Sequence, residues 1–491
     1  MSIMSYGRRI DCLAEQDPDK PIITYEGRTV SRLEFSRSTN RLARAYEKLG
    51  VGQDDFVTIV LPNGIDFFET AFAIWKLGAT PQPVSYRIPK AELCAIIELA
   101  NPSLIVGIPD GMVEGRQSIP ANFQPDPDLS DEPLPDRTAK YAKAMTSGGS
   151  TGRSKLIVAE AAGEFDDETP TFERMHLVPE RPHLVPGPLY HNGPWAWAMM
   201  GLFSGGHVVS MSRFNETETL SLIEKHKIDY LMVVPTMMHR IWRLGEEERS
   251  RYDLSSLRIV LHLAAPCPPW LKEAWIEWLG GERIHELYGG TEAIGATWIT
   301  GTEYLTHRGS VGKAMEGTQL KILDEDGNEL PAGEVGEVYM MPELGVGSTY
   351  HYVGAEPKRH EDFETLGDIG WMDEDGFLYL ADRRTDLIIA GGANIYPAEV
   401  EAALDAHPKV ESSAVIGLPA EDLGQRVHAI VQTTEPVSED ELLAHVADHL
   451  VRYKIPRSIE FVDEPLRDDA GKVRRSALRE ARINQESEKQ K

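Results

Sequence analysis

The sequence predicts an α/β protein with a large N-terminal domain of parallel, helix-covered sheets that carries a small β-barrel, and a mobile α+β C-terminal domain. Three observations predict this class. Helix and strand patterns alternate through most of the chain before residue 309. Short apolar runs separated by turn sequences then extend from 309 to 382. A compact unit follows after about residue 385, and the 491 residues exceed the size of one ordinary domain.

The N-terminal alternation begins with a helix predicted at 31–49. Its apolar residues have helical spacing, Ser31 provides an N-cap and Gly50 ends the helix. The segments that follow alternate between buried strands and amphipathic helices: 56–62, 66–78, 103–109, 221–235, 258–263 and 271–285. This alternation is typical of a parallel sheet whose faces are covered by helices.

The rest of the chain divides into a β-rich segment and a terminal unit. Between 309 and 382, turn sequences such as DEDG, PAG and PELG separate short apolar runs, which predicts a small barrel or meander appended to the sheet. The terminal unit has strand patterns between two predicted helices, at 397–407 and 438–450, and its length suffices for an α+β domain. We therefore predict an N-terminal domain at 1–384 and a C-terminal domain at 386–491.

Composition and charge exclude several classes of function. The net charge of −28 argues against a nucleic-acid partner, because phosphate backbones favour a basic surface. No apolar stretch reaches the ~20 residues of a membrane helix, and the N-terminus becomes charged before any signal-peptide core. We therefore expect a cytoplasmic location. The three cysteines have neither metal-ligand spacing nor a disulfide pattern.

Basic residues are concentrated between Arg452 and Arg482. A locally positive region suits small polyanions even in an acidic protein. From Arg479 onward, we interpret the arginines differently, as a solvated helix face that continues into a frayed tail.

A segment rich in glycine and hydroxyl residues at 146–155 is the sharpest local signal. Small residues let backbone N–H groups turn toward an anion, the hydroxyls add donors and a lysine adds charge. We interpret the segment as a phosphate cradle made of Thr146, Ser147, Gly148, Gly149, Ser150, Thr151, Gly152 and Lys155. It is not a Walker P-loop, because Arg153 stands five residues after Gly148 and no Gly-Lys-Ser/Thr follows.

The same segment formally matches the nucleophile elbow of hydrolases at 148–152. That motif runs from a strand into a helix, whereas the residues after Lys155 have a strand pattern. A plain surface loop is a further alternative. Phosphate binding remains the favoured interpretation.

Further sequence blocks follow this loop in a fixed order. They are YGGTE at 288–292, GDIG at 367–370, DRRTD at 382–386, GGANIYP at 391–397 and GK at 471–472. With this series, from about residue 20 to 480, the chain closely resembles the acyl-adenylate-forming superfamily. This superfamily includes acyl-CoA synthetases, luciferases and peptide-synthetase adenylation domains. The sequence of the glycine-rich loop and HLAAPCP at 262–268 look most similar to the bile-acid-CoA-ligase-like branch.

The resemblance implies a site for ATP and Mg²⁺. The glycine-rich loop would hold the β- and γ-phosphates, Thr291 would bond the α-phosphate and Glu292 would hold Mg²⁺. Tyr288 would lie against the adenine, and Asp368 would bind the ribose hydroxyls with help from Arg383. Gly289 and Ala265 belong to the same implied cofactor-binding set.

The resemblance also implies a second substrate, coenzyme A, and a domain movement. Lys472 would bridge the carboxylate and the α-phosphate during adenylation, and the C-terminal domain would then swing about a hinge at Thr385. Gly391 and Gly392 would next face the pantetheine arm, because glycine allows close backbone approach. His191 would stand at the entrance of the acyl pocket.

Aromatic and methionine residues near His191 and farther along the chain are either core or acyl-pocket residues. They are Trp195, Trp197, Met199, Met200, Met237, Met238 and Trp298. If they line the pocket, the acid is bulky and apolar.

We therefore predict an ATP-dependent carboxylic acid–CoA ligase that acts through an acyl-adenylate on a bulky apolar acid. Two departures, Ser154 for the usual proline and Leu366 for the usual threonine, leave a thioesterification-only enzyme that takes a preformed acyl-adenylate as an alternative. A ligase that loads a carrier-protein thiol and a non-catalytic acyl or nucleotide sensor are further alternatives, although Lys472 and Glu292 disfavour the sensor. The sequence is also compatible with a homodimer.

Overall fold

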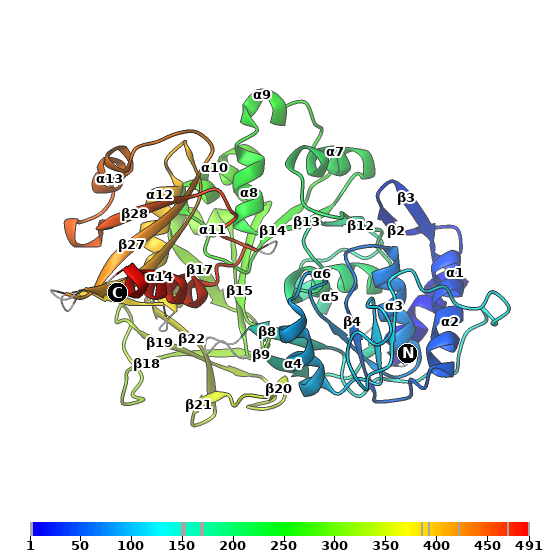
Figure 1. The fold of residues 1–491 in the computed structure, drawn as a ribbon. Helices are drawn as coiled ribbons and strands as arrows, with labels where there is room; N and C mark the ends of the chain where they lie inside the picture. Colours follow the sequence, from blue (N-terminus) through cyan, green and yellow to red (C-terminus); the bar gives the residue numbers. More distant parts are fainter. Residues whose placement is uncertain are drawn as a thin grey trace.

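The computed structural model describes residues 3–148, 154–166, 171–383, 386–390, 393–420, 423–468 and 471–489. A large body formed by the earlier residues packs against a smaller unit formed by the last hundred or so, coloured orange to red in Figure 1. The predicted class, a mixed α/β protein with a large N-terminal and a small C-terminal part, is confirmed.

The central feature of the body is a 14-stranded sheet. One half is parallel and consists of β2 (Pro21–Tyr25), β12 (Val208–Ser210), β11 (His183–Val185), β13 (Tyr230–Val233), β14 (Ile259–His262) and β15 (Ile284–Gly289). At its outer edge β3 (Arg28–Ser31) pairs with β2 in the antiparallel sense. Its helices are α6 (Asn192–Phe203), α7 (Glu216–His226), α8 (Pro235–Trp242), α9 (Gly245–Arg249), α10 (Pro269–Leu279) and α11 (Gly301–Thr306). The strand–helix alternation predicted between 221 and 285 is confirmed.

The other half of this sheet is antiparallel, as the turn-rich sequence between 309 and 382 predicts. It consists of β16 (Ala296–Thr300), β17 (Ser310–Ala314), β23 (Phe377–Arg383), β22 (Phe363–Met372), β19 (Gly336–Pro342) and β18 (Thr318–Leu323), with β21 (Lys358–His360) beside β22. It is a meander only in part, because β17 pairs with β23 and not with β18. The strands β15 and β16 form a hairpin, so the block at 288–292 lies at the junction of the parallel and antiparallel halves.

Two smaller sheets complete the main part of the body. The first is parallel and contains β5 (Thr80–Pro83), β4 (Phe56–Ile59), β6 (Leu104–Val106) and β7 (Ser118–Ile119). The second is antiparallel and contains β8 (Ala144–Gly148), β9 (Ser154–Ala159) and β20 (Tyr350–Val353). Because β9 is a strand, the residues after the glycine-rich loop do not form the helix that a hydrolase nucleophile elbow requires.

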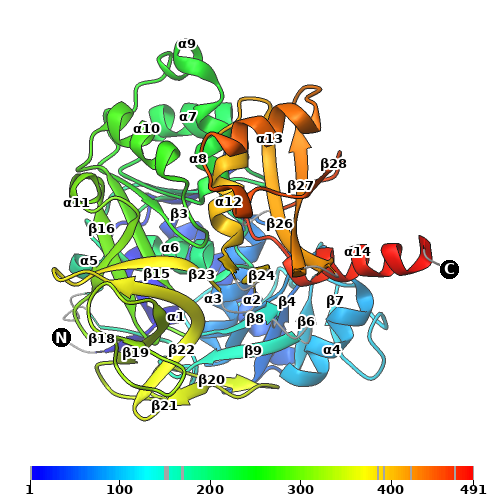
Figure 2. The same ribbon diagram turned by 90° about the vertical axis from the view of Figure 1, so that its left-hand side faces the viewer.

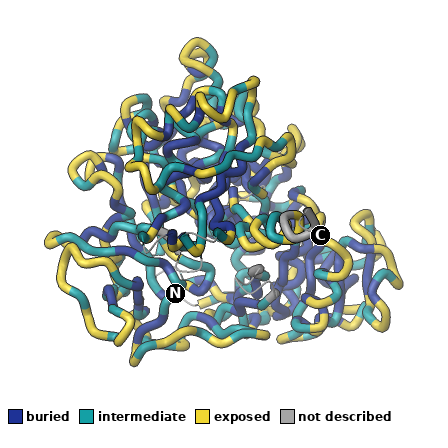
Figure 3. The backbone as a smooth tube through the Cα atoms, turned by 60° about the vertical axis from the view of Figure 1, so that its left-hand side comes forward, coloured by how far each residue is buried: buried dark blue, intermediate teal, exposed yellow. Residues whose placement is uncertain are grey.

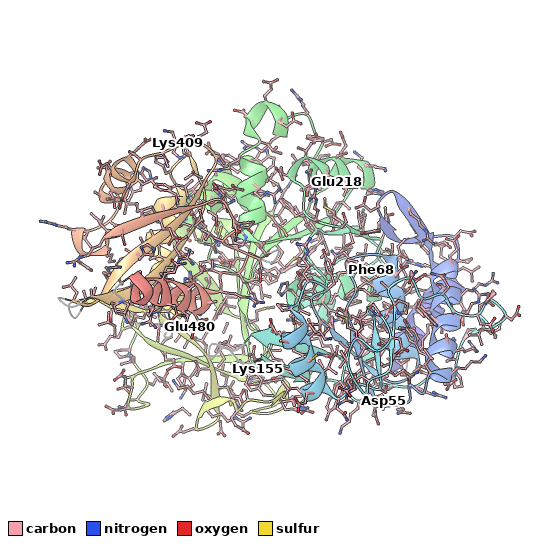
Figure 4. The ribbon with its side chains drawn as sticks, viewed as in Figure 1. Asp55, Phe68, Lys155, Glu218, Lys409 and Glu480 are labelled. Atoms are coloured by element: carbon pink, nitrogen blue, oxygen red, sulfur yellow. The ribbon has the colours of Figure 1, made fainter. Side chains whose placement is uncertain are left out.

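Three helices pack near the N-terminus: α1 (Tyr6–Gln16), α2 (Arg32–Lys48) and α3 (Ile65–Lys76). Ser31 caps α2 as predicted and forms a reciprocal capping box with Glu34. Helix α3 is apolar on nearly every side because it is sandwiched in the core, where Phe68 is fully buried (Figure 4). The remaining N-terminal elements are α4 (Lys90–Ala100), α5 (Thr171–Arg174), β1 (Met4–Ser5) and β10 (Glu164–Phe165).

The C-terminal unit has its own apolar core around a five-stranded sheet. Its strands are β24 (Ile388–Ala390), β25 (Ala393–Ile395), β26 (Val410–Ala420), β27 (Gly424–Thr433) and β28 (Ser458–Val462), and its helices are α12 (Pro397–Asp405), α13 (Glu439–Ala447) and α14 (Arg475–Lys489), with a 3₁₀ turn at Arg452–Lys454. Figure 3 shows buried backbone inside both the body and this unit.

The interpretation of the arginines from Arg479 onward as a solvated helix face agrees with the exposure of Arg479, but both arginines also have partners in the neighbouring sheet. Helix α14 packs on β26, and Arg479 donates a 2.8 Å hydrogen bond to the carbonyl of Gly417. Arg482 forms a 2.8 Å ion pair with Glu460 on β28. These arginines anchor the helix because each has a partner in the neighbouring sheet. Among the helices of the described ranges, none combines the length and the apolar character that crossing a bilayer requires.

Candidate active site

A cleft of about 2710 Å³ lies between the body and the C-terminal unit. Its walls come from both parts: Lys155 and Tyr288 belong to the body, whereas Ser412 and Lys472 belong to the C-terminal unit. Figure 2 shows α12 and β26 of that unit above β8 and β9, the strands that flank the glycine-rich loop. The cleft therefore brings together sequence blocks that are far apart in the chain.

The C-terminal unit is held against helix α8 of the body. Arg243, just after α8, donates hydrogen bonds to the carbonyls of Pro408 and Val410. Gly471 has a φ of +76°, and a Cβ atom there would come within 2.9 Å of the hydroxyl oxygen of Thr236. Only glycine fits this close, left-handed approach, and it fixes the start of the Lys472 segment against the body.

Tyr288 and Asp368 meet at the junction of β15 and the meander. The tyrosine hydroxyl donates a 2.7 Å hydrogen bond to the Asp368 carboxylate, which is largely buried on β22. In the β22–β23 ladder, Asp368 lies opposite Arg383, whose side chain falls outside the described residues. A buried carboxylate beside an aromatic ring can accept hydrogen bonds from paired hydroxyls of a sugar.

Glu292 forms a small polar cluster with two residues of the neighbouring sheet. Its side chain accepts a 2.6 Å hydrogen bond from Tyr352 on β20 and lies 3.7 Å from the ammonium group of Lys155 on β9. The ammonium group also lies 3.6 Å from the centre of the Tyr352 ring. Burial, followed by the charge of Glu292, raises the pKa of Tyr352 above its ordinary value, so the phenol stays protonated and donates.

The strand that leads into the glycine-rich loop is held by side-chain hydrogen bonds. Thr146 on β8 accepts a 3.3 Å hydrogen bond from the amide of Gln82, which in turn accepts a 2.5 Å bond from Thr58. Thr146 and Lys155 both line the cleft. Gly149, Ser150, Thr151 and Gly152, and the side chains of Ser147 and Gly148, lie outside the described residues. The ends of the loop therefore open on the same cleft as Tyr288 and Glu292.

His191 and Lys472 approach each other from opposite sides of the cleft. His191 is the N-cap residue of α6, and its Nε2 lies 3.9 Å from a carboxylate oxygen of Asp468. Burial lowers the pKa of His191 to about 4; Asp468 opposes this shift, whereas Lys472 and Arg474 reinforce it. The imidazole is therefore neutral at neutral pH. Lys472 is exposed, and its backbone N–H donates a 2.9 Å hydrogen bond to Asp468.

The other predicted residues are placed as follows. Ala265, Gly289 and Thr291 line the cleft, with Ala265 in the loop after β14 and the other two at the β15–β16 turn. Gly391, Gly392 and the predicted hinge Thr385 lie outside the described residues. Every site residue predicted from the sequence whose side chain is described thus lies on one cleft, and its role stays a prediction.

The aromatic and methionine residues divide between core and cleft. Trp195, Met199 and Met238 are buried in the core. Trp197, Met200 and Met237 line the cleft. Trp298 does not line it and donates a hydrogen bond to His285. The part of the cleft next to α6 is therefore largely apolar, which suits the body of an organic acid.

Glu292 is a carboxylate of the cleft that suits a hard cation bound together with the phosphate oxygens of a nucleotide. The described residues contain no cluster of three or more acidic, histidine or cysteine side chains that could enclose a metal ion alone. Glu292 is a single, mostly buried carboxylate beside Lys155. Mg²⁺ is commonly held by one or two carboxylates with phosphate oxygens and water, so Glu292 fits this manner of binding.

Three cleft residues were missed by the sequence analysis: Tyr352, Asp468 and Lys143. Tyr352 lies in a strand whose pattern reads as ordinary β structure, and only the β9–β20 ladder brings it to Lys155. From the sequence, Asp468 has the pattern of an ordinary turn residue near Lys472. Lys143 precedes the glycine-rich loop, and nothing in its neighbourhood signals that it faces the cleft.

The family and the relatives of the chain agree with this geometry. Residues 11–351 match the family model described as AMP-binding enzyme, and residues 399–472 match the AMP-binding enzyme C-terminal domain. A feruloyl-CoA synthase from an Amycolatopsis species is 30% identical over 95% of this chain and 96% of its own length. A 2-succinylbenzoate–CoA ligase from Geobacillus kaustophilus is 31% identical over 94% of this chain and 95% of its own length.

A solved structure shows the same fold. The o-succinylbenzoate CoA synthetase from Bacillus subtilis, in complex with its acyl-adenylate intermediate, superposes with a TM-score of 0.82. It is 24% identical in sequence, and the match covers 97% of this chain and 98% of that one. Together with the family match over most of its length, this likeness shows that the chain belongs to the family of AMP-binding enzymes.

Proposed function

We propose that this AMP-binding enzyme is an AMP-forming carboxylic acid–CoA ligase that activates a bulky, mainly apolar acid as an acyl-adenylate. One observation carries the proposal. Tyr288, Asp368 and Glu292 share a single cleft with two lysines, Lys155 from the body and Lys472 from the C-terminal unit. A carboxylate and a polyphosphate repel each other, so joining them requires positive groups at the point of contact.

In the first half-reaction, a carboxylate oxygen of the acid attacks the α-phosphorus of ATP. A new O–P bond forms, the bond from the α-phosphorus to the bridging oxygen breaks, and pyrophosphate leaves with that electron pair. We assign Lys472 to the negative charge that is shared by the carboxylate and the α-phosphate. Thr291 donates to the α-phosphate, and Lys155 with the glycine-rich loop holds the outer phosphates.

We assign Asp368 and Tyr288 to the nucleoside, with Gly289 and Ala265 beside the base and Arg383 beside the ribose. Glu292 would hold Mg²⁺, which neutralises phosphate charge and orients the leaving pyrophosphate. The hydrogen bond from Tyr352 and the nearby ammonium group of Lys155 orient the Glu292 carboxylate.

In the second half-reaction, the thiol sulfur of coenzyme A attacks the acyl carbonyl carbon. The S–C bond forms, the C–O bond to AMP breaks, and the thiol proton is lost to solvent. We propose that the C-terminal domain, predicted at 386–491, turns about Thr385 between the two steps and brings Gly391 and Gly392 to the pantetheine arm. His191, neutral and at the start of α6, stands at the acyl entrance throughout.

A second candidate is an enzyme that converts a preformed acyl-adenylate to the thioester. One contact favours it. Leu366, where the family usually has threonine, lies on the cleft next to Gly290 and makes the wall beside Glu292 apolar. No catalytic charge is lost through this change, so we prefer the complete ligase.

The test is product analysis with ATP, Mg²⁺, coenzyme A and a panel of fatty, aromatic, steroid and terpenoid acids. The proposal expects AMP, pyrophosphate and acyl-CoA in equal amounts for at least one acid. Thioester that forms only from a synthetic adenylate would establish the second candidate. AMP and pyrophosphate without acyl-CoA would indicate another acceptor, such as a carrier-protein thiol.

Several finer predictions are not decided by the family match. We retain the bile-acid-CoA-ligase-like branch, the domain boundary at 384–386, the cytoplasmic location and the homodimer as predictions. The steroid and terpenoid acids in the panel test the first of these, because members of that branch are expected to accept polycyclic acids.

A further inference from the structure

Lys143 is a cation on the wall of the cleft that none of the roles above uses. It directly precedes β8, it is half-buried, and it lines the cleft together with Met145. Strand residues two apart point to the same face, so the side chains of Lys143 and Met145 project toward the same space. Met145 pairs with Ile157 on β9, which also lines the cleft, so the wall beside Met145 is apolar.

The only partner of this ammonium group in the described part of the chain is a neutral side chain. Lys143 donates a hydrogen bond to the amide oxygen of Asn192, the first residue of α6. Within the described ranges, no carboxylate forms an ion pair or hydrogen bond with it. Burial lowers the pKa of Lys143 to about 8, so the group titrates just above neutral pH. Cations withdrawn from water are normally paired, and this one has no counter-charge among the described residues.

The position of Asn192 is firmly fixed. The buried side chain of Asn63 donates 2.9 Å hydrogen bonds to the carbonyls of Gly187 and Met211, and accepts a 2.8 Å bond from the backbone of Leu189. These bonds hold the loop that leads into α6. Asn192 is therefore presented to the cleft on a rigid element.

Helix α6 continues the same wall. Asn192, Ala196 and Met200 are spaced four residues apart, so they share one face of the helix, and all three line the cleft. Arg174, a cation on the far wall, is already paired with Glu316 at 3.0 Å. An acid lying along α6 would thus meet an apolar face that ends at Asn192 and Lys143.

We propose that Lys143 and Asn192 form a polar subsite that binds a second carboxylate of the substrate, distinct from the carboxylate that is activated. This inference rests on the proposed function, because it requires an acid in the cleft. A dicarboxylic acid with an apolar body would supply the counter-charge that Lys143 lacks. A monocarboxylic acid of the same shape would leave the ammonium group buried without one, which is the basis of discrimination.

The test uses equilibrium binding to the full chain, which does not depend on turnover. The probes are 3-phenylpropanoate, its 4-carboxy derivative and its 4-hydroxy derivative. Isothermal titration calorimetry measures their binding. We expect the wild type to bind the dicarboxylate roughly 10- to 100-fold more tightly than the parent acid. Lys143→Met should abolish this preference without weakening the parent acid, and Lys143→Arg should restore much of it.

Lys140→Met is the matched control, because Lys140 lies three residues earlier on the surface and does not line the cleft. Three results would overturn the subsite. They are equal affinity of the wild type for the three probes, no binding of any probe, and a preference for the dicarboxylate that survives Lys143→Met. A preference for the hydroxyl derivative alone would replace it with a neutral hydrogen-bonding role. Pyrophosphate release, measured in parallel with each acid, ATP and Mg²⁺, distinguishes a failure of the proposed ligase from a failure of the Lys143–Asn192 subsite. If the dicarboxylate is preferred but no pyrophosphate is released, only the proposed ligase is contradicted. If pyrophosphate is released but the dicarboxylate is not preferred, only the subsite is contradicted.

Discussion

The hydroxyl of Tyr288 donates a 2.7 Å hydrogen bond to the carboxylate of Asp368, although eighty residues separate them in the chain. The bond joins β15, the last strand of the parallel half of the sheet, to β22 in the antiparallel half. Because Asp368 is largely buried, its orientation depends on this donor and on its strand neighbours. The two residues that we assign to the nucleoside are therefore oriented by a direct bond between them.

Replacing Tyr288 with phenylalanine should weaken ATP binding while leaving the fold intact. The change removes a donor to a charged acceptor but keeps the ring, so we expect the KM for ATP to rise roughly 10-fold with a smaller change in kcat. Steady-state kinetics with varied ATP measures this. Tyr379→Phe is the matched control, because Tyr379 donates a 3.0 Å hydrogen bond to Asp373 away from the cleft. An equal effect of both substitutions would contradict the role of Tyr288.

Replacing Gly290 with alanine should disturb the magnesium end of the cleft. A Cβ atom at this position would lie 2.8 Å from the side chain of Leu366 and 2.9 Å from a carboxylate oxygen of Glu292. Both contacted groups are ends of flexible side chains, so they move to relieve the contact, and the carboxylate is displaced. We expect the Mg²⁺ concentration for half-maximal activity to rise about 10-fold or more.

The control for this variant is Gly52→Ala, whose Cβ atom would meet nothing closer than 3.8 Å. Adding Leu366→Ala to Gly290→Ala should restore part of the activity, because one of the two close contacts disappears. A Gly290→Ala enzyme with an unchanged Mg²⁺ requirement would show that Glu292 does not hold the metal.

Stability should fall in mild acid because several histidines are buried without a charge partner. His183 on β11 is 1% exposed, and burial lowers its pKa to about 4 from the 6.5 of the free side chain. Between pH 6.5 and 4 the unfolded chain therefore binds a proton that the native state does not, and stability present above pH 6.5 is lost as the pH falls. This one residue accounts for about 2 kcal/mol between pH 7 and pH 5.

Urea unfolding of the wild type and of His183→Asn at pH 7 and pH 5 measures this loss. We expect the difference in free energy of unfolding between the two pH values to shrink in the variant. Replacement of the exposed His449 by asparagine is the control, since it removes no buried imidazole. An unchanged pH dependence in His183→Asn would show that its burial is not the cause.

Local patterns predicted the fold well where short-range physics decides the structure. The N-cap at Ser31 and the strand that follows Lys155 both depend on neighbouring residues only. The partners of Glu292 could not be predicted in this way, because Tyr352 reaches it through a ladder between β9 and β20. The sheet partners of the α14 arginines were not predicted for the same reason.

The site residues were predicted as a set because their sequence blocks occur in a fixed order, not because any one of them is distinctive. A lysine such as Lys143 carries no motif, so only its position beside Asn192 reveals that it faces the cleft. The division of the methionines and tryptophans between core and cleft is also a tertiary property. Trp195 and Trp197 are two residues apart on one helix, yet only Trp197 lines the cleft.

The position of Lys472 tests the account most directly. If a nucleotide lies between the body and the C-terminal unit, Lys472→Ala should slow acyl-adenylate formation from ATP and acid by about 10²- to 10³-fold, the cost of one well-placed charged donor. The same variant should still convert a supplied acyl-adenylate to acyl-CoA at close to the wild-type rate, and Lys409→Ala, which removes a surface partner of Glu441, should change neither step. Wild-type adenylation by Lys472→Ala, measured as single-turnover release of pyrophosphate, would contradict the account.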